Sequence, residues 1–430
     1  MADFDDGGMG CHMRLSALVV RFAPLVLLLA LAAHALEVAT WTRGLTAFYD
    51  LGVYRAGGRA LLDGRSLYDG NVFWVLKFTY PPFAALVFTP LALLTPDAAK
   101  LAFTVVNIAA LGAGVWLSLR ALGHRADRRL VMVAIALTGF LFWLEPVRST
   151  IDIGQVNLVL MVLLLWDLTR PAPARWQGVG VGIAAGMKLI PAIFIGYLLL
   201  TGRRAAAGRA AGVLAGTIVL GFVAAPRDSL TYWRGTFLTT NRIGEFAERG
   251  NQSLSGLLAR LSAPAPHSTA LWLLFAVVAG VGGMATAVWA HRRGRELLAV
   301  TVCGLTSCGV APFAWNHHYV WFVPLLILLG HAAYAGRVPV LVPAVAYLAL
   351  VDWPMVFAPR DGIFPPPTGL IAMPVDGLPA FFTRNLYILL AILVVALVAR
   401  RLSVGSDPPG DAAPAGDLGE HDAGGHRGVE

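Results

Sequence analysis

Four short polar clusters interrupt an otherwise apolar chain of 430 residues, each at or beyond the end of an apolar run. They cover residues 49–54, 145–148, 250–253 and 315–318. Asp50 in the first cluster could act as a general base toward a hydroxyl group. Arg148 could bind phosphate through paired hydrogen bonds, and two adjacent histidines could assist near a phosphate or a hydroxyl. We therefore expect acid–base and phosphate chemistry where the clusters meet.

Asp50 also has a structural interpretation, because an aspartate just ahead of a helix usually caps it. Residues 53–62 carry apolar side chains at helical spacing and end in a turn at 63–64, which predicts a helix lying in the membrane interface. Its expected aromatic anchors are Tyr49, Tyr54 and Tyr68. Both roles of Asp50 stay open at this point.

The second cluster contains Glu145 and Arg148, which are three residues apart and could pair across one helical turn. Gln155 and Asn157 follow at the mouth of the next apolar run, where unsatisfied amides are costly. The cluster is either an interfacial salt bridge or the polar wall of a cavity, with Arg148 near a phosphate group.

His317 and His318 are sequence neighbours, which rarely face the same site, and no third ligand is spaced nearby, so we expect no metal ion. They could equally be hydrogen-bonded structural residues. Residues 250–253 could be an ordinary turn in which Ser253 caps a helix over 254–261. Lys188 lies deep in apolar sequence, which indicates either a functional residue or a lysine that reaches the interface from a short helix end.

The composition is that of a polytopic α-helical membrane protein. The chain is 57% hydrophobic and 13% charged, with a mean hydropathy of +0.69, whereas soluble domains carry about 25% charged residues. The net charge of +8 comes from arginines in short loops, which is a signal of membrane topology rather than of nucleic-acid binding. Ten runs are long enough to be considered as spans: 15–36, 98–119, 130–144, 152–167, 209–225, 268–290, 297–313, 319–336, 338–357 and 385–400.

Two further apolar stretches are irregular. Residues 82–94 are too short to cross and are bracketed by prolines, and residues 178–200 are interrupted by 186–188 and Pro191. We predict a half-helix or re-entrant segment on the outer side for the first and a broken helix or hairpin for the second, which suits segments that border a cavity. If neither adds a net crossing, the Arg-rich loops lie in the cytoplasm and all four clusters lie on the outer face. The predicted organisation is a cytoplasmic tail (1–14), a transmembrane domain (15–402) with an outer loop at 37–81, and a disordered cytoplasmic tail (403–430).

Six short strings, in order along most of the chain, resemble the actinobacterial polyprenyl-phosphate-mannose-dependent α-1,2-mannosyltransferases of glycosyltransferase family 87, which belong to the GT-C class. The strings are residues 50–54 with 67–69, 79–83, 145–148, 154–157, 251–253 and 315–319. The resemblance implies a GT-C fold with about 10–12 transmembrane or re-entrant helices and an outer-face interfacial helix. It also implies transfer of mannose, with inversion, from a polyprenyl phosphate that enters from the bilayer.

The resemblance assigns Asp50 as the base and places His318 or His317 in the active site. It places five residues in the donor and acceptor pocket: Glu145, Arg148, Gln155, Asn157 and Asn251. The other candidate binding residues are Tyr54, Lys77, Tyr80, Lys188, Gln252 and Asn316. The expected acceptors are phosphatidylinositol mannosides, lipomannan or lipoarabinomannan at the outer face of the plasma membrane. We expect no cofactor and no metal, because the outer loops contain no Asp-x-Asp-type motif.

Three alternatives remain. The same fold could use another polyprenyl-phosphate sugar, such as arabinose or glucose. The broken helices and Lys188 would also suit a lipid or sugar transporter, in which loss of function would map to Lys188 rather than to Asp50. An inactive scaffold subunit is the third alternative, and the presence of Asp50 makes it less attractive.

Overall fold

The computed structural model describes residues 21–37, 48–171, 174–239, 242–265, 268–353 and 368–404, which form helices and loops without any strand. The predicted all-α membrane fold is confirmed. A first helix covers residues 21–37. The other α and 3-10 (η) helices are α2 (Tyr49–Leu62), α3 (Pro82–Leu93), α4 (Pro96–Ala121), α5 (Arg128–Leu141), α6 (Glu145–Ile153), α7 (Asn157–Leu168), α8 (Val179–Met187), η2 (Ile190–Ala192), α9 (Ile193–Leu200), α10 (Arg204–Ala224), α11 (Pro226–Arg234), η3 (Thr236–Leu238), α12 (Leu254–Ser262), α13 (Thr269–Arg292), α14 (Glu296–Val310), η5 (Asn316–Trp321), α15 (Phe322–Tyr334), α16 (Leu341–Leu350), η6 (Gly369–Ala372), α17 (Gly377–Arg384) and α18 (Leu386–Val404). The predicted tails lie outside the described residues, apart from 403–404 at the end of α18.

Four of the described helices are long and apolar enough to cross a membrane, namely α4, α10, α13 and α18. The pair α6 and α7, bent by 118°, makes a fifth if it counts as one span. The predicted spans 319–336 and 338–357 contain shorter helices, α15 and α16, and the first of them begins with the 3-10 helix η5. The chain is therefore polytopic, whereas the set of ten crossings stays a prediction.

Both irregular stretches have the predicted shape. The short helix α3 starts after Pro81 and is separated from α4 by Leu94 and Thr95. The second stretch breaks at Lys188, whose backbone is extended (φ −152°, ψ 130°) between α8 and η2. Pro191, which has no N–H to donate, follows in η2, so the segment resumes as a new helix rather than as a continuation of α8.

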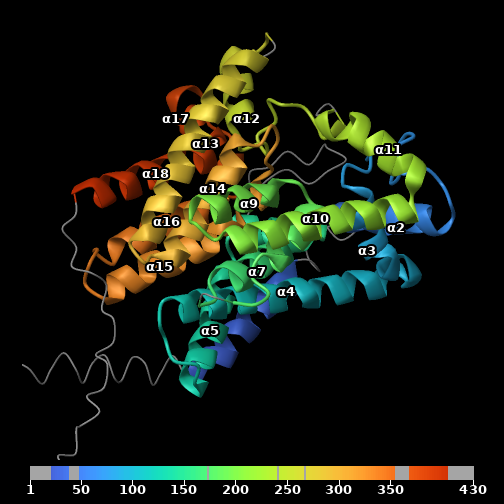
Figure 1. The fold of residues 1–430 in the computed structure, drawn as a ribbon. Helices are drawn as coiled ribbons and strands as arrows, with labels where there is room; N and C mark the ends of the chain where they lie inside the picture. The colour runs from blue at the N-terminus through green and yellow to red at the C-terminus, as the bar shows by residue number, and fades with distance from the viewer. Residues whose placement is uncertain are drawn as a thin grey trace, which may run out of the picture.

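The packing gathers the breaks of the helical scaffold into the interior. In Figure 1, α13 and α18 lie at one end of the molecule and α3 and α11 at the other. Helix α7 contacts both α4 and α8, and η5 contacts α6, α7 and α14. The α6–α7 bend, the Lys188 break and η5 are therefore neighbours, which fits irregular backbone that borders a cavity.

Helix α2 begins at Tyr49, four residues earlier than predicted, so Asp50 lies inside its first turn. The N-cap residue is Phe48 and no side chain caps the helix, so the capping role of Asp50 is wrong. Tyr54 and Tyr68 are only 0% and 4% exposed. Their role as interfacial anchors is also wrong. Tyr54 is buried where α2 packs against α3, and the Tyr68 ring, beyond α2, packs against Phe78 and Tyr232.

Candidate active site

A sharp turn between α6 and α7 places two polar side chains in the interior. Gly154 forms this turn in the left-handed conformation (φ 70°, ψ 47°). A Cβ atom at this position would lie 2.6 Å from Cβ of Leu51, so the close approach of α2 also requires glycine. Gln155 and Asn157 follow the turn directly and are buried.

Asp50 is held by Gln155. The Gln155 Nε2 atom donates to Asp50 Oδ2 at 2.7 Å and to the Tyr80 hydroxyl at 3.2 Å. Burial raises the pKa of Asp50 to about 6, while Lys188 and the hydrogen bond from Gln155 act in the opposite direction. A carboxylate with such a pKa is ionised at neutral pH and can still take up a proton, as a general base must.

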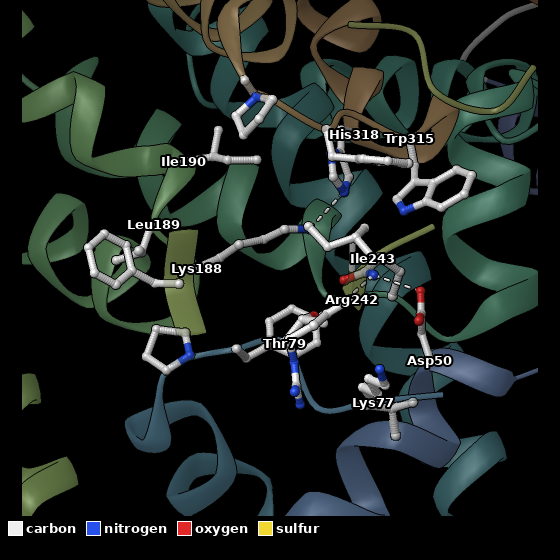
Figure 2. Close-up of a pocket in the computed structure, with 18 of the residues that line it drawn as sticks. Asp50, Lys77, Thr79, Lys188, Leu189, Ile190, Arg242, Ile243, Trp315 and His318 are labelled. Atoms are coloured by element: carbon white, nitrogen blue, oxygen red, sulfur yellow. Dashed lines mark hydrogen bonds between the residues drawn. The ribbon is translucent and has the colours of Figure 1, made fainter. Parts of the chain in front are cut away.

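Lys188 extends from the helix break across the site toward His318, as Figure 2 shows. Its Nζ atom donates to Asn157 Oδ1 at 3.0 Å and lies 2.9 Å from His318 Nε2. An ammonium group has only donors, so His318 accepts through Nε2 and a neutral ring carries its proton on Nδ1. These contacts use two of the three N–H groups of Lys188, and the third can bond a ligand.

Asn157 also fixes η5, because its Nδ2 atom donates to the carbonyl oxygen of His317 at 2.8 Å. The hydroxyl of Thr150 donates to the same oxygen at 3.2 Å. The amide therefore joins three elements, namely α7, the Lys188 break and η5. This geometry explains how two adjacent histidines are distinguished: His318 faces Lys188, whereas His317 contributes its backbone.

Asp50, Gln155, Lys188 and His318 border a cavity with a volume of about 420 Å³. Its polar lining consists of Asp50, Lys77, Thr79, Tyr80, Gln155, Lys188, Arg242, Ser307 and His318. The remaining walls are apolar and aromatic, with contributions from α2, α11, η2 and the residues before η5. Three cationic side chains and one carboxylate leave a surplus of two positive charges, which suits a ligand that carries phosphate.

Six of the candidate residues line the cavity: Asp50, Lys77, Tyr80, Gln155, Lys188 and His318. Sequence reasoning missed Arg242, which lies beyond η3 in a long segment without helical periodicity. The only available signal was its positive charge in a predicted outer loop. Eight other candidates are absent from the lining: Tyr54, Glu145, Arg148, Asn157, Asn251, Gln252, Asn316 and His317.

Arg148 does not line the cavity but belongs to an ionic cluster. Its guanidinium lies 2.8 Å from Glu37, 3.6 Å from Asp152 and 3.9 Å from Asp352. The predicted pair with Glu145 is wrong, since Glu145 instead accepts hydrogen bonds from Asn316 and, at 2.7 Å, from the Tyr387 hydroxyl. Both side chains are buried among other partners, and Arg148 ties the helix over 21–37 to α6 through Glu37.

The third cluster also has a structural role in the described chain. Ser253 caps α12 by accepting from the Gly256 N–H at 3.1 Å, as predicted. Asn251 accepts from the Ala314 N–H at 3.2 Å, and Gln252 donates to the carbonyl of Arg384 at 2.9 Å. These amides join the segments around η5 and α18. Among the described residues, no three His, Cys, Asp or Glu side chains are grouped as metal ligands.

The chain is similar in sequence to several known proteins. The model of glycosyltransferase family 87 matches residues 78–312, more than half of the chain. A polyprenol-phosphate-mannose-dependent alpha-(1-2)-phosphatidylinositol mannoside mannosyltransferase of Mycobacterium tuberculosis is 36% identical over 351 residues, which cover 76% of this chain and 81% of the relative. A Mycolicibacterium smegmatis protein of the same name is 36% identical over 318 residues, or 67% and 71% of the two chains.

A second Mycolicibacterium smegmatis relative is named as a polyprenol-phosphate-mannose-dependent alpha-(1-2)-phosphatidylinositol pentamannoside mannosyltransferase. It is 32% identical over 357 residues, which cover 80% of this chain and 85% of the relative. No solved structure matches the chain.

Proposed function

The chain belongs to glycosyltransferase family 87, and on this basis we propose that it transfers mannose from polyprenyl-phosphate-mannose to a phosphatidylinositol mannoside or a related lipoglycan. The relatives carry this donor and this class of acceptor in their names. The proposed product has an α-1,2 linkage, formed with inversion of a β-linked donor. We place the reaction at the outer face of the plasma membrane, as the distribution of arginines among the loops predicts.

The single observation that carries the proposal is the presence of Asp50 and Lys188 in one cavity. A glycosyl transfer from a lipid phosphate needs a base for the incoming hydroxyl and a cation for the departing phosphate. Asp50 supplies the base, and Lys188, held by Asn157 and His318, supplies the cation. Lys77 and Arg242 add positive charge around the same space.

In the proposed step, Asp50 takes the proton of the acceptor 2-hydroxyl while that oxygen forms a bond to C1 of the donor mannose. The bond between C1 and the phosphate oxygen breaks, and the phosphate leaves with the electron pair. Attack on the face opposite the leaving group converts the β linkage into an α linkage. Lys188 stabilises the charge that develops on the phosphate, and no further reactant is needed.

In the transporter alternative, loss of function would map to Lys188 rather than to Asp50. Because both residues line one cavity, a single catalytic site accounts for both of them. This arrangement favours the transferase over the transport alternative.

The proposal is tested with purified full-length protein, radiolabelled polyprenyl-phosphate-mannose and a panel of phosphatidylinositol mannosides. We expect labelled product that is cleaved by an α-1,2-mannosidase and that also forms in EDTA. Parallel assays contain polyprenyl-phosphate-arabinose or polyprenyl-phosphate-glucose as donor. Transfer of one of these sugars, with no transfer of mannose by folded protein, would contradict the proposed donor.

A further inference from the structure

The side-chain amide of Gln155 has every hydrogen-bonding position occupied. Its Nε2 atom donates to Asp50 and Tyr80. Its Oε1 atom accepts from the Tyr54 hydroxyl and, at 3.0 Å, from the N–H of Val156. A primary amide has two N–H donors and an oxygen with two lone pairs, so this set is complete.

These partners also fix which way the amide points. The backbone N–H of Val156 can only donate, so it must face the amide oxygen rather than the NH2 group. The NH2 group is thereby directed at Asp50 Oδ2. A flipped amide would set two N–H donors against each other and an oxygen against a carboxylate, and both contacts are repulsive.

The backbone around Gln155 is fixed as well. Its own N–H donates to the carbonyl of Thr150 at 2.8 Å, directly after the left-handed residue Gly154. The side chain is 1% exposed, although its edge borders the cavity. The amide therefore has little capacity left for a sugar, in contrast to the binding role expected from the sequence.

We propose that Gln155 is the positioning residue of Asp50: it binds Oδ2 and directs Oδ1 to the acceptor hydroxyl. It reaches the reaction only through this carboxylate, and Tyr54 and Tyr80 hold it in turn. The inference rests on the role of Asp50 in the proposed function. It goes beyond that role because Gln155, expected from the sequence to contact the substrate, instead orients the carboxylate of Asp50.

The electrostatic surroundings of Asp50 give this arrangement a measurable signature. Lys188 interacts electrostatically with the carboxylate from the α8–η2 break, and Tyr49, Tyr54 and Tyr80 do so from α2 and the segment before α3. The hydrogen bond from Gln155 lowers the pKa of Asp50. Loss of this bond should therefore move the acidic limb of the pH–rate profile to higher pH, an effect that a substrate contact would not produce.

The test compares Gln155→Met with Gln177→Met, which changes a buried glutamine outside the cavity. For Gln155→Met we expect kcat to fall roughly 10-fold or more, since a hydrogen bond to a charged group is lost. The KM values for donor and acceptor should change little, and the acidic limb of the pH–rate profile should shift to higher pH. Gln177→Met should keep the wild-type profile.

A double-mutant cycle with Asp50→Asn isolates the coupling. In the Asp50→Asn background, Gln155→Met should have little further effect on kcat. Tyr54→Phe, which removes one contact of the amide oxygen, should lower kcat less and shift the limb in the same direction. This second variant keeps the test decisive if Gln155→Met does not fold.

Three results would overturn the inference: an unshifted acidic limb in both variants, a rise in KM that accounts for the loss of rate, or additive effects in the cycle. Each of them leaves mannose transfer by the wild-type enzyme intact. Failure of the wild-type enzyme to transfer mannose would instead overturn the proposed function and, with it, the role of Asp50.

Discussion

The ammonium nitrogen of Lys188 lies 2.9 Å from Nε2 of His318, although 130 residues separate them along the chain. The contact joins the break after α8 to the 3-10 helix η5. Neither residue lies inside a regular α-helix: Lys188 follows the end of α8, and His318 lies in a 3-10 helix. The position of the lysine is thus set by two irregular segments, with Asn157 as the common partner.

Replacement of Lys188 by Met should lower kcat roughly 100-fold, because the proposed mechanism then lacks one group that stabilises the leaving phosphate. Lys100→Met, which removes a lysine on α4 paired with Asp97 outside the cavity, is the matched control. Steady-state transfer assays with both variants in detergent measure the difference. Wild-type turnover in Lys188→Met would remove the lysine from the mechanism.

Asp50→Asn should reduce transfer by roughly 100- to 10,000-fold, because the amide keeps the shape of the side chain but cannot accept the proton. The yield and the melting temperature of the purified variant should remain close to those of the wild type, since Asp50 does not cap α2. Single-turnover measurements with saturating donor separate this chemical defect from weaker binding. An active Asp50→Asn enzyme is incompatible with a base at this position.

The rate should depend on pH through the ionisation of Asp50. Its pKa is raised to about 6 by burial, so the carboxylate form that the proposed reaction needs is lost as the pH falls below this value. We expect kcat/KM to be flat at neutral pH and to decrease about 10-fold per pH unit on the acidic side. A pH–rate profile recorded with enzyme that recovers full activity after acid exposure checks this. A flat profile through this range would contradict the assignment.

Arg242→Gln should raise the KM for the donor roughly 10-fold, as expected when a charged hydrogen-bond donor to phosphate is removed. Arg242→Lys should recover part of the affinity. Arg234→Gln, an exposed arginine at the end of α11 that does not line the cavity, should behave as the wild type. Equal donor KM values in Arg242→Gln and Arg234→Gln would exclude Arg242 from the donor site.

Arg148→Met should affect stability rather than substrate affinity. It leaves Glu37, Asp152 and Asp352 without their shared cation, and loss of the buried partner from this partly buried cluster should cost up to about 3–5 kcal/mol of unfolding free energy. Arg65→Met removes an exposed ion pair and should cost less than about 1 kcal/mol. Denaturation in detergent measures both. A stable Arg148→Met protein with a raised donor KM would restore the phosphate role expected from the sequence.

Much of the arrangement could be predicted because polar residues at the ends of apolar runs must find partners inside the protein. Three of the four clusters are joined directly, since Asn251 bridges to Trp315 and Asn316 bonds Glu145. The first cluster lies on α2, which contacts α6. The break at Lys188 could also be predicted, since a glycine and a proline flank it in an apolar stretch.

The direction of individual side chains could not be predicted. Arg148 and Gln155 lie close together in the sequence, yet one points into an ionic cluster and the other to Asp50. The chain bends by 118° between α6 and α7, so the two side chains do not follow one helical periodicity. The hydrophobic pattern of the sequence does not predict the angle of such a bend. Arg242 could not be found because its long connecting segment has no periodicity from which to infer a face.

The left-handed residue at the α6–α7 bend bears on how functional positions are recognised. Any side chain at Gly154 would press on Leu51, the immediate neighbour of Asp50, while the backbone conformation would itself be strained. In a saturation mutagenesis screen scored by growth or product, position 154 should therefore tolerate as little as position 50. A map of tolerated substitutions would therefore score Gly154 like a residue that contacts the substrate. A separate measurement of protein abundance would distinguish the structural defect at position 154 from the catalytic defect at position 50.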